Sequence, residues 1–326
     1  MAYMHYVHLA LALAFALFSA SVSAQKSFPS RPVTFVVPIT QGTAADIMAR
    51  LLGAKLALHW KQPVVIENKP GASGTIGASL VARAAPNGYT LLLPGAIYTM
   101  APAVIKNLNY DPANSFVFIS LTGSTNWALA INAATMPAQD LEEFLAMVRA
   151  QPGRFHYATP GSGSPHHFGF EMFKHRLGLD VVHVPYKGAA GAMTDLLSGQ
   201  VQVMLVPAGT AIANMRAARF RILAVSGAER LGPLPDVPTF RERGIDFLEA
   251  LDGWSAVFAP AKTPRAIVER INADFRAVIE STEIREQFER QGLMPRATTI
   301  EQTTEIVRAD LLRWAKVAVD AKIAAE

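Results

Sequence analysis

Short apolar runs alternate with longer segments of helical periodicity along most of the chain. Residues 33–38 (VTFVVP) are β-branched and apolar, which is typical of a strand covered on both faces. A turn at residues 39–43 leads into a helix, whose apolar face is predicted to consist of Ile47, Leu51, Ala54 and Leu58. The strand pattern then returns at residues 63–67 and 89–93, on either side of a helix at residues 78–85. This β-α-β-α-β order predicts a parallel sheet with right-handed crossovers.

The alternation continues to the end of the chain. We expect further strands at residues 116–121, 127–131, 155–158, 181–184, 201–206, 220–225 and 253–258. We expect further helices at residues 140–150, 189–197, 264–280 and 283–291, one that begins at residue 165, and one from residue 300 onward. In the last helix, Val307, Leu311, Trp314 and Ala318 recur at helical spacing and form a packing face.

The length of the chain, 326 residues, exceeds what one hydrophobic core usually supports. We therefore predict two domains: a discontinuous first domain of residues 25–125 and 251–326, and a second domain of residues 126–250. Residues 122–126 are the predicted first crossing, and residues 253–258 return the chain. With 51% hydrophobic residues the chain can form real cores, and with no cysteine it contains no disulfides.

The first 24 residues have the pattern of a secretory signal. Residues 9–18 form an unbroken apolar run that is too short to span a bilayer. Val22, Ser23 and Ala24 fit the small-x-small rule, which places the cleavage before Gln25. An uncleaved anchor is less favoured, because small residues follow the run instead of apolar ones. The sequence thus predicts an exported, periplasmic protein.

The net charge is +4, with basic and acidic residues interspersed. The chain contains no Lys/Arg run and no aromatic-basic array, so we expect no nucleic-acid binding. A mildly basic surface suits acidic small molecules, although many other proteins share it.

Two strand–turn–helix units carry turns of small residues. One turn contains Thr40, Gln41, Gly42, Thr43 and Ala44, and the other spans residues 159–165 (TPGSGSP), whose proline suits the first position of a helix. Free amide groups at a helix start, together with the helix dipole, favour a bound anion. Either turn alone is explained as well by an ordinary α/β unit with a small packing turn. Two such turns in different halves of the chain indicate a cleft between them.

Ser162 and Ser164 are followed closely by His166 and His167, which raises the alternative of an exported serine hydrolase. Neither serine lies in the G-x-S-x-G elbow of esterases, and no acidic residue is identifiable as the third group, so the alternative is disfavoured. The histidines, His156 included, lack the H-x-x-x-H spacing of a helical metal site. We expect no catalytic residue, no metal and no cofactor.

Three other side chains have candidate roles. Lys187 is the cation of a candidate cleft turn and pairs with a ligand carboxylate or with water. Trp254, near the return crossing, covers an apolar ligand or packs in the core. Asp46 lies in the first helical turn, where its charge complements the dipole, a structural role.

Six segments together resemble one family: FVVPITQGTAADIMARLL, QPVVIENKPGASGTIGASLVARAAPNGYTLLL, YATPGSGSPHHFGFEMF, VVHVPYKGAAGAMTDLLSGQVQVM, RILAVSGAERLGPLPDVPTF and FAPAKTPRAIVERIN. They resemble, in family order, the Bug family, the extracytoplasmic solute receptors of tripartite tricarboxylate transporters. The resemblance implies a type II periplasmic-binding-protein fold, two α/β domains that close over a small ligand without catalysis. It also implies membrane transporter subunits, or a sensor, as partners, and we expect a monomer.

In that family a ligand carboxylate is held largely by backbone groups and ordered water between one turn of each domain. The resemblance places these turns at residues 40–44 and at Thr159, Gly161, Ser162, Gly163 and Ser164.

Two positions depart from the family pattern. Thr43 stands where many members carry a second glycine, and Val206 stands where many carry an aspartate that could pair with a ligand ammonium. We therefore expect a non-amino ligand: a dicarboxylate, or an aromatic or aliphatic monocarboxylate.

Overall fold

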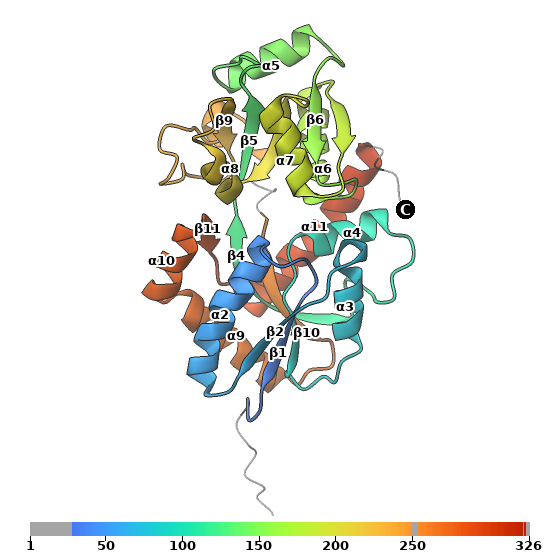
Figure 1. Cartoon of the computed structure of the whole chain (residues 1–326). Helices are drawn as coiled ribbons and strands as arrows, with labels where there is room; N and C mark the ends of the chain where they lie inside the picture. Colours follow the sequence, from blue (N-terminus) through green and yellow to red (C-terminus); the bar gives the residue numbers. More distant parts are fainter. Residues whose placement is uncertain (1–27, 249–252, 322, 324–326) are drawn as a thin grey trace, which may run out of the picture.

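The computed structural model describes residues 28–248, 253–321 and 323. The predicted signal at residues 1–24 and its cleavage before Gln25 lie outside the described residues. Two β-sheets with helices packed on them form two lobes, one above the other in Figure 1. This arrangement confirms the predicted α/β class with two sheets.

The lower lobe in Figure 1 contains a sheet with the strand order β11-β4-β10-β3-β1-β2. β1 is parallel to β2 and β3, as the sequence predicts, whereas β10 is antiparallel to β3 and β4, and β11 is antiparallel to β4. The sheet is therefore mixed. Its strands are β1 Val33–Val37, β2 Val64–Asn68, β3 Thr90–Leu92, β4 Phe116–Thr125, β10 Ser255–Pro260 and β11 Leu293–Pro295.

The upper lobe contains a second sheet with the order β7-β6-β8-β5-β9. β6 is parallel to β7 and β8, and β5 is antiparallel to β8 and β9. Its strands are β5 Trp127–Asn132, β6 His156–Thr159, β7 Val182–Pro185, β8 Val203–Pro207 and β9 Phe220–Val225.

The helices lie where periodicity predicts them, with two additions. α4 and α8 were not predicted: α4 has a proline in its interior, and α8 is only seven residues long and rich in small residues. The short strand β11 was also not predicted. The helices are α2 Ala44–Trp60, α3 Thr75–Ala82, α4 Ile97–Val104, α5 Leu141–Ala150, α6 Pro165–Leu177, α7 Ala189–Ser198, α8 Ala208–Asn214, α9 Arg265–Ile279, α10 Thr282–Arg290 and α11 Ile300–Asp320.

The crossing between the sheets is shorter than predicted. β4 continues through residues 122–125, so that only Asn126 separates it from β5. The polar residues of this stretch stay in the strand because β10 and β11 pair with it, Ser255 opposite Gly123 and Leu293 opposite Thr125. Polarity therefore misled the prediction, since ladder hydrogen bonds satisfy the backbone there.

The predicted apolar face of α2 is wrong. Leu58 is 75% exposed and Ala54 is exposed, while Ile47 and Leu51 are only partly buried. The buried face consists of Ala45, Met48, Ala49, Leu52 and Leu56. Apolar residues lie on nearly every side of this helix, so the spacing of its apolar residues does not decide which face packs on the sheet.

The C-terminal helix α11 buries Val307, Trp314 and Ala318, as predicted, and leaves Leu311 partly buried. It packs on α4 and β4 of the lower lobe and on α6 of the upper lobe, where Trp314 meets Phe168 with ring centroids 5.7 Å apart. Among the described residues, no helix is both long enough and apolar enough to cross a membrane.

Candidate functional site

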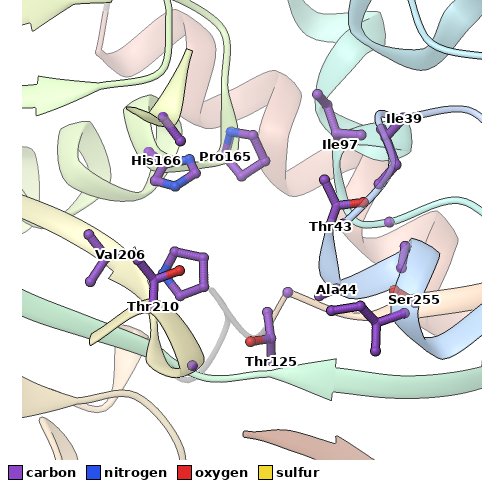
Figure 2. A pocket seen from close by; sticks show the side chains of 18 of the residues that line it. Ile39, Thr43, Ala44, Ile97, Thr125, Pro165, His166, Val206, Thr210 and Ser255 are labelled. Carbon is purple, nitrogen blue, oxygen red and sulfur yellow. The ribbon is translucent and has the colours of Figure 1, made fainter. Parts of the chain in front are cut away.

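A cavity of about 1010 Å³ lies between the two sheets. Its walls include the starts of several helices, where backbone amide groups have no partner within the helix. Figure 2 shows Thr43 and Ala44, at the start of α2, on one side of the cavity, and Val206 and Thr210 on the other. The predicted site residues that line it are Thr40, Gly42, Thr43, Ala44, Ser164, Val206 and Trp254.

The other predicted site residues lie outside the lining. Gln41, Ser162 and Lys187 are exposed, and none of them contributes to the cavity wall. Thr159, Gly161 and Gly163 lie behind the wall in the second turn, where they form the hydrogen bonds described below.

The first turn is held from behind by Asp46. Gly42 has a φ of +82°, a conformation that favours glycine, and donates its N–H to Asp46 Oδ2 at 2.9 Å. Thr43 occupies the N-cap position, but its hydroxyl donates to Thr40 O at 2.9 Å instead of capping the helix. The first amide groups of α2 therefore remain without a partner inside the helix.

Asp46 is 1% exposed and accepts four hydrogen bonds. Besides Gly42, the donors are Arg50 Nε and Nη2, both at 3.0 Å, and Asn68 Nδ2 at 2.8 Å. Burial acts to raise the pKa of Asp46, but the bonds from Arg50, Gly42 and Asn68 outweigh it and the pKa is lowered. The carboxylate stays ionised, as the structural role predicted for it requires.

The second turn is closed by Ser164. Its hydroxyl donates to Gly161 O at 2.7 Å and accepts the backbone N–H of His167 at 3.3 Å, so Ser164 is the N-cap of α6. Gly161 and Gly163 have φ values of +152° and +72°. Pro165 stands at the first position of the helix, as predicted.

Among the described residues, no hydrogen bond joins the Ser164 hydroxyl to a histidine ring, as the serine hydrolase alternative would require. The Ser164 hydroxyl serves as a helix cap, and His167 Nδ1 accepts the N–H of Gly163 at 3.1 Å. Ser162 is exposed and does not line the cavity. Within the described part of the chain, no cluster of three or more His, Asp or Glu side chains is placed to hold a metal ion.

The wall around Val206 is mainly apolar, with the hydroxyl of Thr210 beside it (Figure 2). Val206 is fully buried in β8 and lines the cavity with Met193, Met204 and Ile212. Hydrophobic side chains at this end favour the carbon skeleton of a ligand over a second buried charge.

Trp254 combines the two roles that its sequence position left open. It lines the cavity and belongs to a hydrophobic core cluster, and it is 4% exposed. Its indole Nε1–H donates to Asp310 Oδ2 at 2.6 Å. The N–H is therefore used inside the protein.

Several lining residues were not among the predicted ligand-binding residues. Ser73 in the turn before α3 has a φ of +53°, which is strained for a residue with a side chain. Trp127 and His166 meet edge to face with ring centroids 4.7 Å apart, and burial lowers the pKa of His166 to about 3, so this ring is neutral. The glycines beside Ser73 signalled a tight turn, but no sequence signal pairs Trp127 with His166.

Known proteins share this architecture over nearly the whole chain. The family described as "Tripartite tricarboxylate transporter family receptor" matches residues 48–322. Protein BugT of Bordetella pertussis is 32% identical over 301 residues, which cover 92% of this chain and 91% of BugT. This match confirms the resemblance to the Bug family.

Two solved structures from Rhodopseudomonas palustris are also similar. Rpa4515 with adipate has a TM-score of 0.79 and 31% identity, covering 92% of this chain and 100% of that one. MatC (Rpa3494) with bound malate has a TM-score of 0.73 and 31% identity, covering 89% and 99%. These likenesses confirm the predicted periplasmic-binding-protein fold. The chain belongs to the tripartite tricarboxylate transporter family of receptors, the family that includes the Bug proteins.

Proposed function

We propose that this protein is a periplasmic receptor that captures a small carboxylate between its two sheets and performs no chemistry on it. The observation that carries the proposal is the convergence of two helix starts, at Thr43 and at Ser164, on one cavity. Helix starts present N–H donors and the positive end of the dipole, which together suit a carboxylate. The adipate and malate bound by two relatives support the same ligand class.

The electrostatics of the cavity favour backbone recognition over ion pairing. Glu289 and Arg290 are the charged residues among its described lining, and both are exposed at the end of α10. A micromolar receptor needs about 8 kcal/mol of net binding free energy. Amide hydrogen bonds to a charged group contribute about 1.5–3 kcal/mol each, so three or four of them with apolar cover suffice after the entropy cost.

The apolar wall narrows the ligand class further. An ammonium group beside Val206, Met204 and Met193 would be desolvated without a carboxylate partner on this wall. The ligand is therefore a non-amino acid: a dicarboxylate, or an aromatic or aliphatic monocarboxylate. The Trp254 ring offers further apolar cover.

Capture proceeds by closure of two domains, residues 25–125 with 251–326 and residues 126–250. Asn126 between β4 and β5, and the backbone pair of Thr125 with Gly253 at 3.0 and 3.1 Å, support a hinge at this level. The empty protein must be nearly isoenergetic between open and closed forms, so that the ligand's differential affinity decides the state. The closed form then engages membrane transporter subunits, or a sensor, as a monomer.

Calorimetry on the refolded, ligand-stripped mature protein tests this proposal. The panel contains C4–C8 dicarboxylates, citrate, aromatic monocarboxylates, glutamate and aspartate. We expect saturable one-to-one binding of a non-amino carboxylate. Tight binding of glutamate or aspartate would refute the argument from Val206 and leave the receptor standing, whereas no binding across the panel would refute carboxylate capture.

A matched pair of variants separates the receptor from the hydrolase. Ser164→Ala removes a cavity-lining cap, and Ser162→Ala changes an exposed serine of the same turn. We expect weaker ligand binding for Ser164→Ala, near-wild-type binding for Ser162→Ala, and no ester hydrolysis by any form. Turnover by the wild type that either substitution abolishes would support the hydrolase instead.

A further inference from the structure

Four rings form a continuous stack behind the second turn. Phe170 of α6 stacks on Tyr157 of β6 with ring centroids 4.0 Å apart, and Tyr157 stacks on His183 of β7 at 4.8 Å. His183 stacks on His167 of α6 at 4.0 Å, with their planes 9° apart. The stack therefore ends in two imidazoles that lie face to face.

Both imidazoles are hydrogen-bonded to the turn. His167 Nδ1 accepts the N–H of Gly163 at 3.1 Å, so this nitrogen carries no proton. His183 Nε2 lies 2.7 Å from Thr159 Oγ1, and the Thr159 hydroxyl donates to Gly161 O at 3.2 Å. The same hydroxyl also accepts the N–H of Gly161 at 3.3 Å, so Thr159 links His183 to the turn in either tautomer of the ring.

We propose that His167 and His183 are positioning residues that hold the second turn in its ligand-binding shape, and that protonation of His167 releases the turn and weakens ligand capture. Neither ring needs to touch the ligand. They act through Gly163 and Thr159, which lead into Ser164 at the cavity wall. The effect on ligand capture rests on the proposed function, whereas the effect on the turn does not.

A proton on His167 Nδ1 would convert the acceptor of the Gly163 N–H into a second donor. The two N–H groups would then point at each other, and the bond would be lost. Protonation of both rings would also place two positive charges face to face at 4.0 Å, which is unfavourable in a partly buried site.

The surroundings keep both rings neutral. Burial lowers the pKa of His167 and the charge of Lys174 lowers it further, while Glu171 opposes them. Burial and His167 lower the pKa of His183 to about 4. Glu171 is itself engaged, since it accepts the Tyr157 hydroxyl at 2.5 Å and Lys174 Nζ at 2.8 Å.

From the remaining neighbour of the turn, α4, the nearest side chain to Gly163 is the apolar Val104. Because both rings are neutral at neutral pH, the turn keeps its hydrogen bonds there. The turn is lost only as the pH falls below the ordinary imidazole value of about 6.5.

Nuclear magnetic resonance on the labelled mature protein tests the turn without any ligand. Between pH 8 and pH 4, we expect the Gly163 amide shift to follow the titration of the His167 ring. In His167→Asn, whose side-chain oxygen can replace Nδ1 as acceptor but does not titrate, we expect the Gly163 shift to stay constant. His175→Asn, at an exposed position of the same helix, is the matched control and keeps the wild-type profile.

Calorimetry with adipate as the probe tests the consequence for capture. The ratio of the wild-type Kd to the Kd of His167→Asn cancels the protonation of adipate itself. We expect this ratio to rise about tenfold for each pH unit below the measured pKa of His167, because only the neutral form is competent. His167→Phe keeps a ring but removes the acceptor, and should bind weakly at every pH.

A Gly163 amide that ignores the His167 titration would overturn the proposal, and so would a constant Kd ratio. If adipate does not bind at neutral pH, carboxylate capture fails for this probe, while the amide titration still decides whether His167 holds the turn.

Discussion

The strongest prediction concerns Asp46, which holds the first turn of the proposed ligand site. Asp46→Asn keeps the size of the side chain but removes its charge and one acceptor. The bonds from Gly42 and Asn68, at 2.9 and 2.8 Å, are partly or wholly lost in a site that is 1% exposed. The Arg50 side chain is 42% exposed and can return to water, so its bonds count for less.

We therefore expect Asp46→Asn to lower the free energy of unfolding by about 2–4 kcal/mol, the loss of one or two hydrogen bonds to a buried charge. Adipate binding should weaken by about tenfold, or about 1.4 kcal/mol, because the Gly42 amide no longer has a fixed direction. The pKa of Asp46 is lowered from 3.8, so its stabilisation is present above that pH and is lost as the pH falls below it.

Urea denaturation at pH 7 and at pH 3 measures both effects, with calorimetry for the ligand. Asp320→Asn is the matched control, because Asp320 pairs with Lys316 on the exposed surface at 2.8 Å, and its loss should leave the free energy of unfolding close to that of the wild type. An Asp46→Asn protein as stable at pH 7 as this control would refute the reasoning.

Three further predictions follow from the second lobe. Val206→Asp places a charge on the apolar wall and should weaken adipate binding by about tenfold or more while improving the binding of amino acids. Calorimetry with adipate and with glutamate measures both effects, and an unchanged ratio of the two Kd values would contradict the prediction. Gly163→Ala forces a side chain into a φ of +72° with Val104 Cγ2 only 3.3 Å away, and should lower the free energy of unfolding by about 1–2 kcal/mol; a neutral result in urea denaturation would show that the turn adapts. His166→Phe should reduce the loss of stability below pH 6.5, because the pKa of His166 is lowered to about 3 and only the unfolded chain takes up a proton on this ring between the two values. If the free energy of unfolding of the variant falls from pH 7 to pH 4 as steeply as that of the wild type, His166 does not cause the loss.

The secondary structure was largely predictable because strand and helix periods are local properties. The apolar runs at residues 33–38 and 220–225 were recognisable as strands from their composition. Pro165 was recognisable as the start of α6. The failures have physical reasons. The polar residues 122–125 remain in β4 because β10 and β11 complete their hydrogen bonds, and α2 turns a different face inward because it is apolar on both.

The site was predictable only in part. The turns at Gly42 and Ser164 could be recognised because glycine and hydroxyl residues before a helix have a local function. Lys187, the cation that the sequence suggested, lies outside the cavity lining, whereas the neutral His166 lies in it. A difference of one position around a helix or turn changes which group faces a cavity, and sequence spacing does not resolve it.

The order of residues alone determined the α/β alternation, the two small-residue turns and the family motifs, because each depends on neighbours along the chain. The tertiary structure decided which helix starts line one cavity, that Asn68 bonds to Asp46, and that His167 stacks on His183. These contacts join segments brought together by packing, and their chemistry depends on burial. A pKa such as that of His166 is set by the surroundings of the folded protein, which no local pattern encodes.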